Sequence, residues 1–94
     1  MQLKSVYKVP NGKLLKIILD YDINNKQINK INITGDFFAY PEESIDIMEK
    51  KLIDTLLIKE ELLEKINSVI KQYNIEFIGL DAEGLVEGIL RCIK

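Results

Sequence analysis

The chain has 94 residues, of which 47% are hydrophobic and 30% charged, and its formal net charge at pH 7 is −2. This length suits one small domain with a modest core, and charges of mixed sign argue against nucleic acid as a main partner. No apolar run is long enough to span a bilayer, and the first residues lack the apolar core of a signal peptide. We therefore expect a cytoplasmic protein with neither a membrane nor a nucleic acid partner.

The chain contains a single cysteine, Cys92, and no histidine. One cysteine cannot form an internal disulfide, and the chain lacks the usual ligand set of a zinc or iron–sulfur site. The usual general base near neutral pH is missing, which excludes Ser-His-Asp and Cys-His catalysis. No phosphate-binding P-loop is present either. We expect no catalytic residue, metal site or cofactor in this chain alone, and we expect Cys92 to be a small core residue.

Alternating apolar residues in the first third of the chain predict three β-strands, over residues 3–9, 13–22 and 28–35. The Pro-Asn-Gly segment at 10–12 reads as a turn in which glycine accepts a positive φ, and the Asn-Asn pair at 24–25 suits a tight hairpin. Short turns join antiparallel neighbours, so we expect a three-stranded meander. The residues expected on its core face are Leu3, Tyr7, Val9, Leu15, Ile17, Leu19, Tyr21, Ile31 and Ile33.

The apolar period then becomes helical and predicts three helices. The first has Pro41 in its first turn and closes on Leu52. Residues 59–73 form the clearest helix, with Asn74 as its stop, and Asp81 is the expected N-cap of the last helix. The charged residues that suit the dipole of the first helix are Glu42, Glu43, Asp46, Lys50 and Lys51.

Two glycines, Gly84 and Gly88, stand four residues apart in the last helix, where each costs about 1 kcal/mol relative to alanine. This spacing predicts a close backbone approach on that side of the helix. Residues 75–79 are either an extended linker or a brief fourth strand. Strands first and helices second predict an α+β sandwich, with three helices packed on one face of a three-stranded antiparallel sheet. The other face of that sheet is either solvated or docks onto a partner.

The stretch TGDFFAYPEE places Phe37 and Phe38 side by side, although neighbouring side chains on a strand point to opposite faces. In one interpretation, Asp36 forms an Asx-type turn and both phenylalanines are buried under the first helix. In the other, one phenylalanine stays exposed with Tyr40 as an aromatic anchor for a partner. The residues alone favour burial of both.

The segments KVPNGKLLKI and NITGDFFAYPEE, followed by an acidic helix start, resemble the accessory (C-terminal) domain of lipoate–protein ligases. They are most similar to the free-standing small subunit of archaeal-type split ligases. The resemblance covers nearly the whole chain and is strongest over residues 8–52. In one departure, Asp54 stands where family members often have glycine, and aspartate tolerates the left-handed conformation better than most residues.

The resemblance implies a single accessory domain over residues 1–94, with a fold similar to iron–sulfur scaffold domains. It implies ATP-dependent attachment of lipoate to a lysine of a carrier protein through lipoyl-adenylate, with ATP, lipoate and magnesium held by a separate catalytic chain. This chain would be the non-catalytic subunit of that heterodimer, required for adenylation, and would meet the lipoyl-carrier protein transiently. The positions expected to dock or to position the partner are Lys13, Gly35, Asp36, Phe37, Phe38, Tyr40 and Pro41.

Two other functions stand beside this one. An iron–sulfur or sulfur-transfer scaffold would need several Cys or His ligands, or one reactive cysteine, and the composition argues against it. A non-enzymatic interaction module of the same fold, unrelated to lipoylation, is the second alternative. The sequence leaves open whether the acyl group is lipoate, octanoate or another acyl group.

Overall fold

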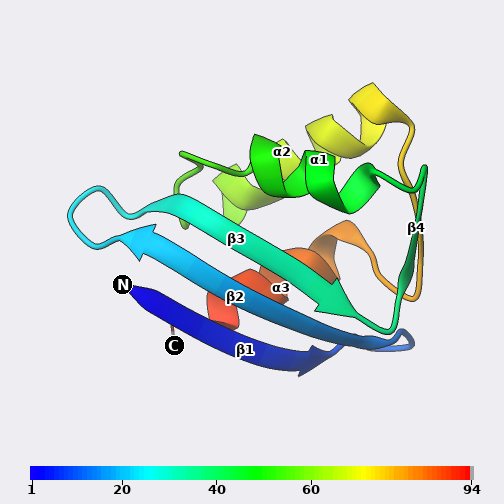
Figure 1. The fold of residues 1–94 in the computed structure, drawn as a ribbon, viewed down its shortest axis with the longest axis horizontal. Helices are drawn as coiled ribbons and strands as arrows, with labels where there is room; N and C mark the ends of the chain where they lie inside the picture. The colour runs from blue at the N-terminus through cyan, green and yellow to red at the C-terminus, as the bar shows by residue number, and fades with distance from the viewer. Residues whose placement is uncertain (94) are drawn as a thin grey trace.

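Three antiparallel strands form the sheet on which the helices pack, in a computed structural model that describes residues 1–93 (Figure 1). The strands β1 (Gln2–Lys8), β2 (Leu14–Asp22) and β3 (Gln27–Gly35) lie in the order β1-β2-β3. The central strand β2 places Ile17 opposite Ile33 of β3. The predicted meander is confirmed, and each strand begins and ends within one residue of the expected position.

The inward face of this sheet is apolar, and its most deeply buried side chains lie mainly on the central strand. Leu15, Ile17 and Leu19 of β2 are fully buried. A register shift near the end of β2 leaves Asn29 as an extra residue in β3 and brings Ile28 into the core, where it is fully buried too. All residues expected on the core face are buried or half-buried against it: Leu3, Tyr7, Val9, Leu15, Ile17, Leu19, Tyr21, Ile31 and Ile33.

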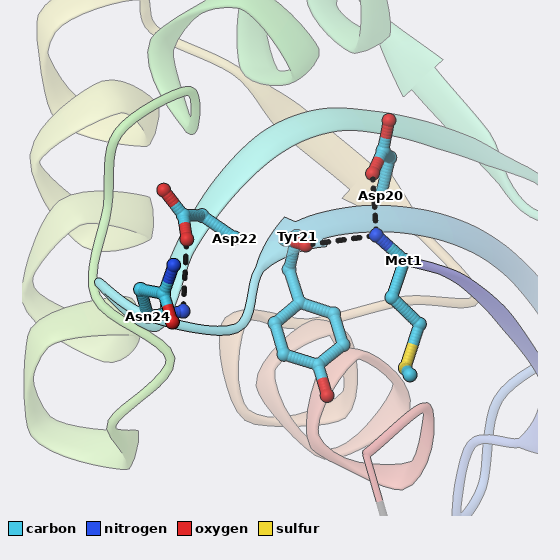
Figure 2. Close-up of polar contacts among 5 residues, drawn as sticks. All are labelled: Met1, Asp20, Tyr21, Asp22 and Asn24. Atoms are coloured by element: carbon cyan, nitrogen blue, oxygen red, sulfur yellow. Dashed lines mark hydrogen bonds and ion pairs between the residues drawn. The ribbon is translucent and has the colours of Figure 1, made fainter.

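The hairpin between β2 and β3 is held by the carboxylate of Asp22. Its Oδ1 accepts hydrogen bonds from the backbone N–H groups of Asn24 at 2.8 Å and Asn25 at 3.2 Å, and Figure 2 shows the first of these. Lys26 closes the turn with a φ of 54°. The expected turn at the two asparagines is confirmed.

The turn between β1 and β2 departs from the expectation for Gly12. The positive φ, 59°, belongs to Asn11, which is among the residues that tolerate it best. Gly12 is needed for a different reason, because a Cβ there would lie 2.6 Å from the carbonyl oxygen of Gly79. The glycine therefore permits a close approach between this turn and the segment before the last helix.

Three helices, α1 (Ser44–Lys51), α2 (Lys59–Tyr73) and α3 (Ala82–Arg91), cover the inward face of the sheet (Figure 1). α1 contacts β3, α3 contacts β1 and β2, and α2 packs against both other helices. This is the predicted α+β arrangement. Within residues 1–93, no helix is long and apolar enough to cross a membrane. The buried residues that the helical segments contribute are Met48, Leu52, Leu62, Ile66, Val69, Leu85, Val86 and Ile89.

The start of α1 differs from the sequence expectation. Pro41 precedes the helix, and its carbonyl accepts a hydrogen bond of 3.0 Å from Ser44 N–H, so residues 41–43 form a turn instead of a first helical turn. The Tyr40–Pro41 peptide bond is cis. Placing Pro41 and the two following glutamates in the helix was therefore wrong, and Asp46 is the acidic residue of its first turn.

Two residues with positive φ end the first two helical segments. Asn74 stops α2 at φ 52°, as expected. Asp54, at φ 70°, follows the last turn of α1, and its N–H donates to the carbonyl of Ile28 at 2.7 Å. The aspartate that departs from the family pattern thus adopts the left-handed conformation that a glycine would favour.

Helix α3 approaches the sheet closely through its glycines. Asp81 caps it by accepting the N–H of Gly84 at 2.6 Å, as predicted. A Cβ on Gly88 would lie 2.6 Å from Cδ2 of Leu15, and the Ser5 hydroxyl donates to the Gly88 carbonyl at 2.7 Å. The predicted close approach is confirmed.

A second, two-stranded sheet lies at one end of the molecule (Figure 1). β4 (Phe38–Tyr40) pairs antiparallel with β5 (Glu76–Ile78), with Phe38 opposite Ile78 and Tyr40 opposite Glu76. Residues 75–79 therefore contain a brief strand, which resolves the open alternative. This strand does not extend the main sheet, and its partner β4 was not expected.

We predict that Gly35→Ala destabilises the fold by about 2 kcal/mol, because its φ of +153° and the overlap of a Cβ with the Leu14 carbonyl oxygen both disfavour a side chain. In a domain of this size the thermal midpoint would fall by about 8–16 °C. The control is Thr34→Ala, at an exposed neighbour, which should change stability by less than about 0.5 kcal/mol. An unchanged midpoint for Gly35→Ala would contradict the close approach.

Candidate partner-binding site

The short ribbon of β4 and β5 presents three large apolar side chains to solvent. Phe38 is 60% exposed, Tyr40 53% and Ile78 51%. Phe38 and Ile78 are directly opposite each other across the two strands, and Tyr40 lies on the same face of β4. We call Phe38, Tyr40 and Ile78 the aromatic edge. It is a contiguous exposed patch, in contrast to a single exposed hydrophobic residue, and such patches often mark interaction sites.

The opposite side of the ribbon packs on the core. Phe37 and Phe77 are half-buried and meet edge to face, with ring centroids 6.3 Å apart and an interplanar angle of 84°. Such a pair contributes about 0.5–1.5 kcal/mol beyond its area burial. The two adjacent phenylalanines therefore point to opposite sides. The expectation that both are buried was wrong for Phe38, because its pairing with Ile78 in the short ribbon leaves it 60% exposed.

Gly35 and Asp36 set the direction in which the chain leaves β3. The backbone N–H of Asp36 donates to the carbonyl of Leu14 at 2.9 Å. The Asp36 carboxylate is exposed and accepts no hydrogen bond within residues 1–93, so the expected Asx-type turn is not formed. These two residues orient the ribbon through their backbone.

Lys13 lies beside the ribbon, although it is distant from it in sequence. Its N–H donates to the Gly79 carbonyl at 2.8 Å. A Cβ built on Gly79 would lie 3.1 Å from the Lys13 Cβ and 3.6 Å from the Phe37 Cα, which places all three segments together. The structure thus brings Lys13 next to the segment with which it was predicted to act. Ile78 was not predicted, since its role depends on a strand pairing that has no local signal.

The concave regions of the surface lie elsewhere. An open groove of about 580 Å³ runs between the start of α3 and the turn after β1, and a smaller one of about 430 Å³ lies beside α2. Neither is lined by a residue of the aromatic edge. Within residues 1–93, no three acidic, thiol or imidazole side chains gather to hold a metal ion. No residue of the predicted segment lines either groove.

Cys92 lies in the core, only 5% exposed, as expected. Burial raises the pKa of its thiol above the ordinary value of 9.0, and a hydrogen bond with Ser5 opposes this effect. A reactive cysteine needs the opposite shift. The thiol therefore does not have the environment of a nucleophile.

Comparisons with known proteins agree on one family. The family model described as "Bacterial lipoate protein ligase C-terminus" matches residues 9–89. "Lipoate-protein ligase A subunit 2" of Thermoplasma acidophilum is 35% identical over 86 residues, covering 88% of this chain and 82% of that protein. A similar fold occurs in a structural study of an archaeal lipoylation system from the same organism, described as a bi-partite lipoate protein ligase and its E2 lipoyl domain. That chain superposes with a TM-score of 0.80 at 27% identity, covering 95% of this chain and 94% of that one.

We predict that the two adjacent phenylalanines respond differently to truncation. Phe37→Ala should lower the free energy of unfolding by about 2–3 kcal/mol, somewhat less than for a fully buried phenylalanine. Phe38→Ala should change it by less than about 0.5 kcal/mol, because its ring lies in solvent. Urea unfolding of both variants measures the difference. Equal losses would show that Phe38 is buried.

We also predict that burial of the Cys92 thiol slows its alkylation and makes the free energy of unfolding dependent on pH. The folded state holds the neutral thiol, so its contribution is complete below the pKa of the unfolded chain and is lost as pH rises through the folded pKa. The free energy of unfolding should therefore fall above about pH 9, and less so in Cys92→Ala.

At about pH 8, iodoacetamide should alkylate the native protein at least about tenfold more slowly than the protein in urea. Equal rates would place the thiol at the surface.

Proposed function

This chain belongs to the family of lipoate–protein ligase C-terminal domains, and on that premise we propose that it docks on a separate catalytic chain and is required there for lipoate adenylation. Its relatives over most of both chains come from a bipartite ligase, and it is an accessory subunit of such an enzyme. Docking and the adenylation requirement are the proposed steps. Lipoyl-adenylate would then transfer its acyl group to a lysine of a carrier protein.

The observation that carries the docking proposal is the exposure of the aromatic edge. Aromatic residues are enriched at interfaces, and a few buried aromatic anchors usually supply most of the binding energy. Phe38 and Tyr40 belong to the segment that resembles the family, and Lys13 and Glu76 add charged groups at its rim. Covering Phe38, Tyr40 and Ile78 would remove from water a patch that is costly to leave exposed.

The chemistry of the reaction limits what this chain contributes. In adenylation, a lipoate carboxylate oxygen attacks the α-phosphorus of ATP and pyrophosphate leaves. The resulting mixed anhydride reacts with water, so the catalytic chain needs a closed, water-excluding state. A subunit that binds the closed state more tightly than the open one shifts the equilibrium by that difference in affinity. We infer that this chain acts in this way, through shape and apolar contact, because its one thiol is buried and its segment offers no nucleophile.

The requirement for adenylation is tested by incubating the catalytic chain with ATP, lipoate and magnesium, with and without this protein. Pyrophosphate release and lipoyl-AMP should appear only when both chains are present. Octanoate in place of lipoate distinguishes the two acyl groups. Equal lipoyl-AMP formation by the catalytic chain alone would refute the proposal.

The docking surface is tested with Phe38→Ala. The dissociation constant of the heterodimer should rise at least about tenfold, equivalent to roughly 1.4 kcal/mol, with the thermal midpoint unchanged. Ile53→Ala is the matched control, because Ile53 is also exposed, at 43%, but lies beyond the end of α1, outside the aromatic edge. If calorimetry gives equal affinities for the Phe38 variant and the unaltered protein, the interface lies outside the aromatic edge.

A further inference from the structure

The outer face of the main sheet is a second exposed surface, with a chemistry unlike that of the aromatic edge. Strand alternation places Lys4 and Val6 of β1 on this face, next to Lys16 and Ile18 of β2. In the register, Lys4 lies opposite Ile18 and Val6 lies opposite Lys16. Lysines and apolar residues therefore alternate both along each strand and across the two strands. Val6 is 62% exposed and Ile18 45%. All three helices lie on the other side of the sheet (Figure 1).

The carboxylates of this face are confined to the hairpin end and are already engaged. Asp20 accepts the amino group of Met1 at 3.3 Å, and Asp22 is bonded to the hairpin N–H groups (Figure 2). Lys4 and Lys16 form no ion pair within residues 1–93. The middle of the face is therefore basic, although the whole chain has a net charge of −2.

The two surfaces suit partners of different lifetimes. An apolar aromatic patch suits a subunit that stays bound, because it is costly to re-expose. A lysine-rich face with a small apolar centre suits a partner that must arrive quickly and leave, because charge complementarity raises association rates more than affinity. In a carrier-modifying ligase the carrier protein is a substrate that leaves after each turnover.

From these observations we propose that the outer face of the sheet binds an acidic surface of the lipoyl-carrier domain, while the aromatic edge holds the catalytic chain. This inference rests on the proposed function. Two copies of this chain would not pair through the face, since their lysines would repel each other. Single-stranded nucleic acid fits poorly as well, because this face offers no aromatic ring on which a base could stack.

The role of the face would be to raise the local concentration of the carrier and to orient its acceptor lysine toward the catalytic chain. It would act on the transfer step and leave adenylation unchanged. Such steering weakens as ionic strength rises, since exposed charges more than about 8 Å apart are largely screened at physiological salt. Transfer should therefore be more sensitive to salt than adenylation.

The test is the double variant Lys4→Glu/Lys16→Glu, assembled with the catalytic chain and supplied with ATP, lipoate and the host carrier domain. We expect normal heterodimer affinity and lipoyl-AMP formation, but an increase of at least about tenfold in KM for the carrier at low salt. The salt dependence of kcat/KM should flatten. The matched control is Lys65→Glu/Lys71→Glu, which makes the same charge change on exposed positions of α2 and should leave the carrier KM within about twofold.

The results that would overturn this inference differ from those that would overturn the proposed function. An unchanged carrier KM, or an equal rise in the control, would overturn this inference. Loss of heterodimer affinity or of lipoyl-AMP formation in the Lys4/Lys16 variant would overturn it too, by assigning the face to the catalytic chain. If the catalytic chain adenylates lipoate alone, the proposed function fails, and titration of the carrier domain into this protein still tests the face. If this titration detects no binding, or binding that does not weaken as salt rises, the proposed role of the outer face is rejected.

Discussion

The burial of β2 beneath α3 is the constraint on which the rest of the molecule depends. The absence of a side chain on Gly88 lets the helix descend onto Leu15, and the Ser5 hydroxyl fixes the helix by binding the Gly88 carbonyl. With this close contact, the inner face of a very small sheet is filled entirely by its own chain. The surfaces that remain are the outer face of the sheet and the short ribbon at its end. Both of these surfaces carry exposed apolar side chains.

Much of this arrangement follows from local patterns. Alternation of apolar residues defines the three long strands because one face of the sheet must be buried, and the helical period defines α2 to the residue. The caps at Asn74 and Asp81 follow from side chains that suit those backbone conformations. What local patterns miss is set by tertiary structure. The ribbon strands have three residues each, too few for a periodic signal, and pair across two intervening helices. A proline next to acids is typical of a helix start, whereas here Pro41 opens the turn that precedes the helix.

The candidate site shows the same division. The sequence singles out Phe37 and Phe38 but cannot orient them, because that requires knowing where β3 ends and which strand pairs with β4. Ile78 joins Phe38 only through that pairing. The lysines of the outer face are dispersed along the chain, and only the register of β1 and β2 gathers them. Sequence reasoning therefore identified one segment of the site, and the folded chain supplied the neighbours that make it a surface.

The pairing of β4 with β5 also affects when the aromatic edge forms. Phe38 and Ile78 are separated in the chain by all of α1 and α2, so their juxtaposition is a long-range contact that forms late in synthesis and folding. A nascent chain that has emerged only as far as α2 exposes Phe38 but has no β5 to hold it in place. The aromatic edge therefore requires the chain at least through β5, and a catalytic subunit that recognises this surface would not bind copies that end before that strand.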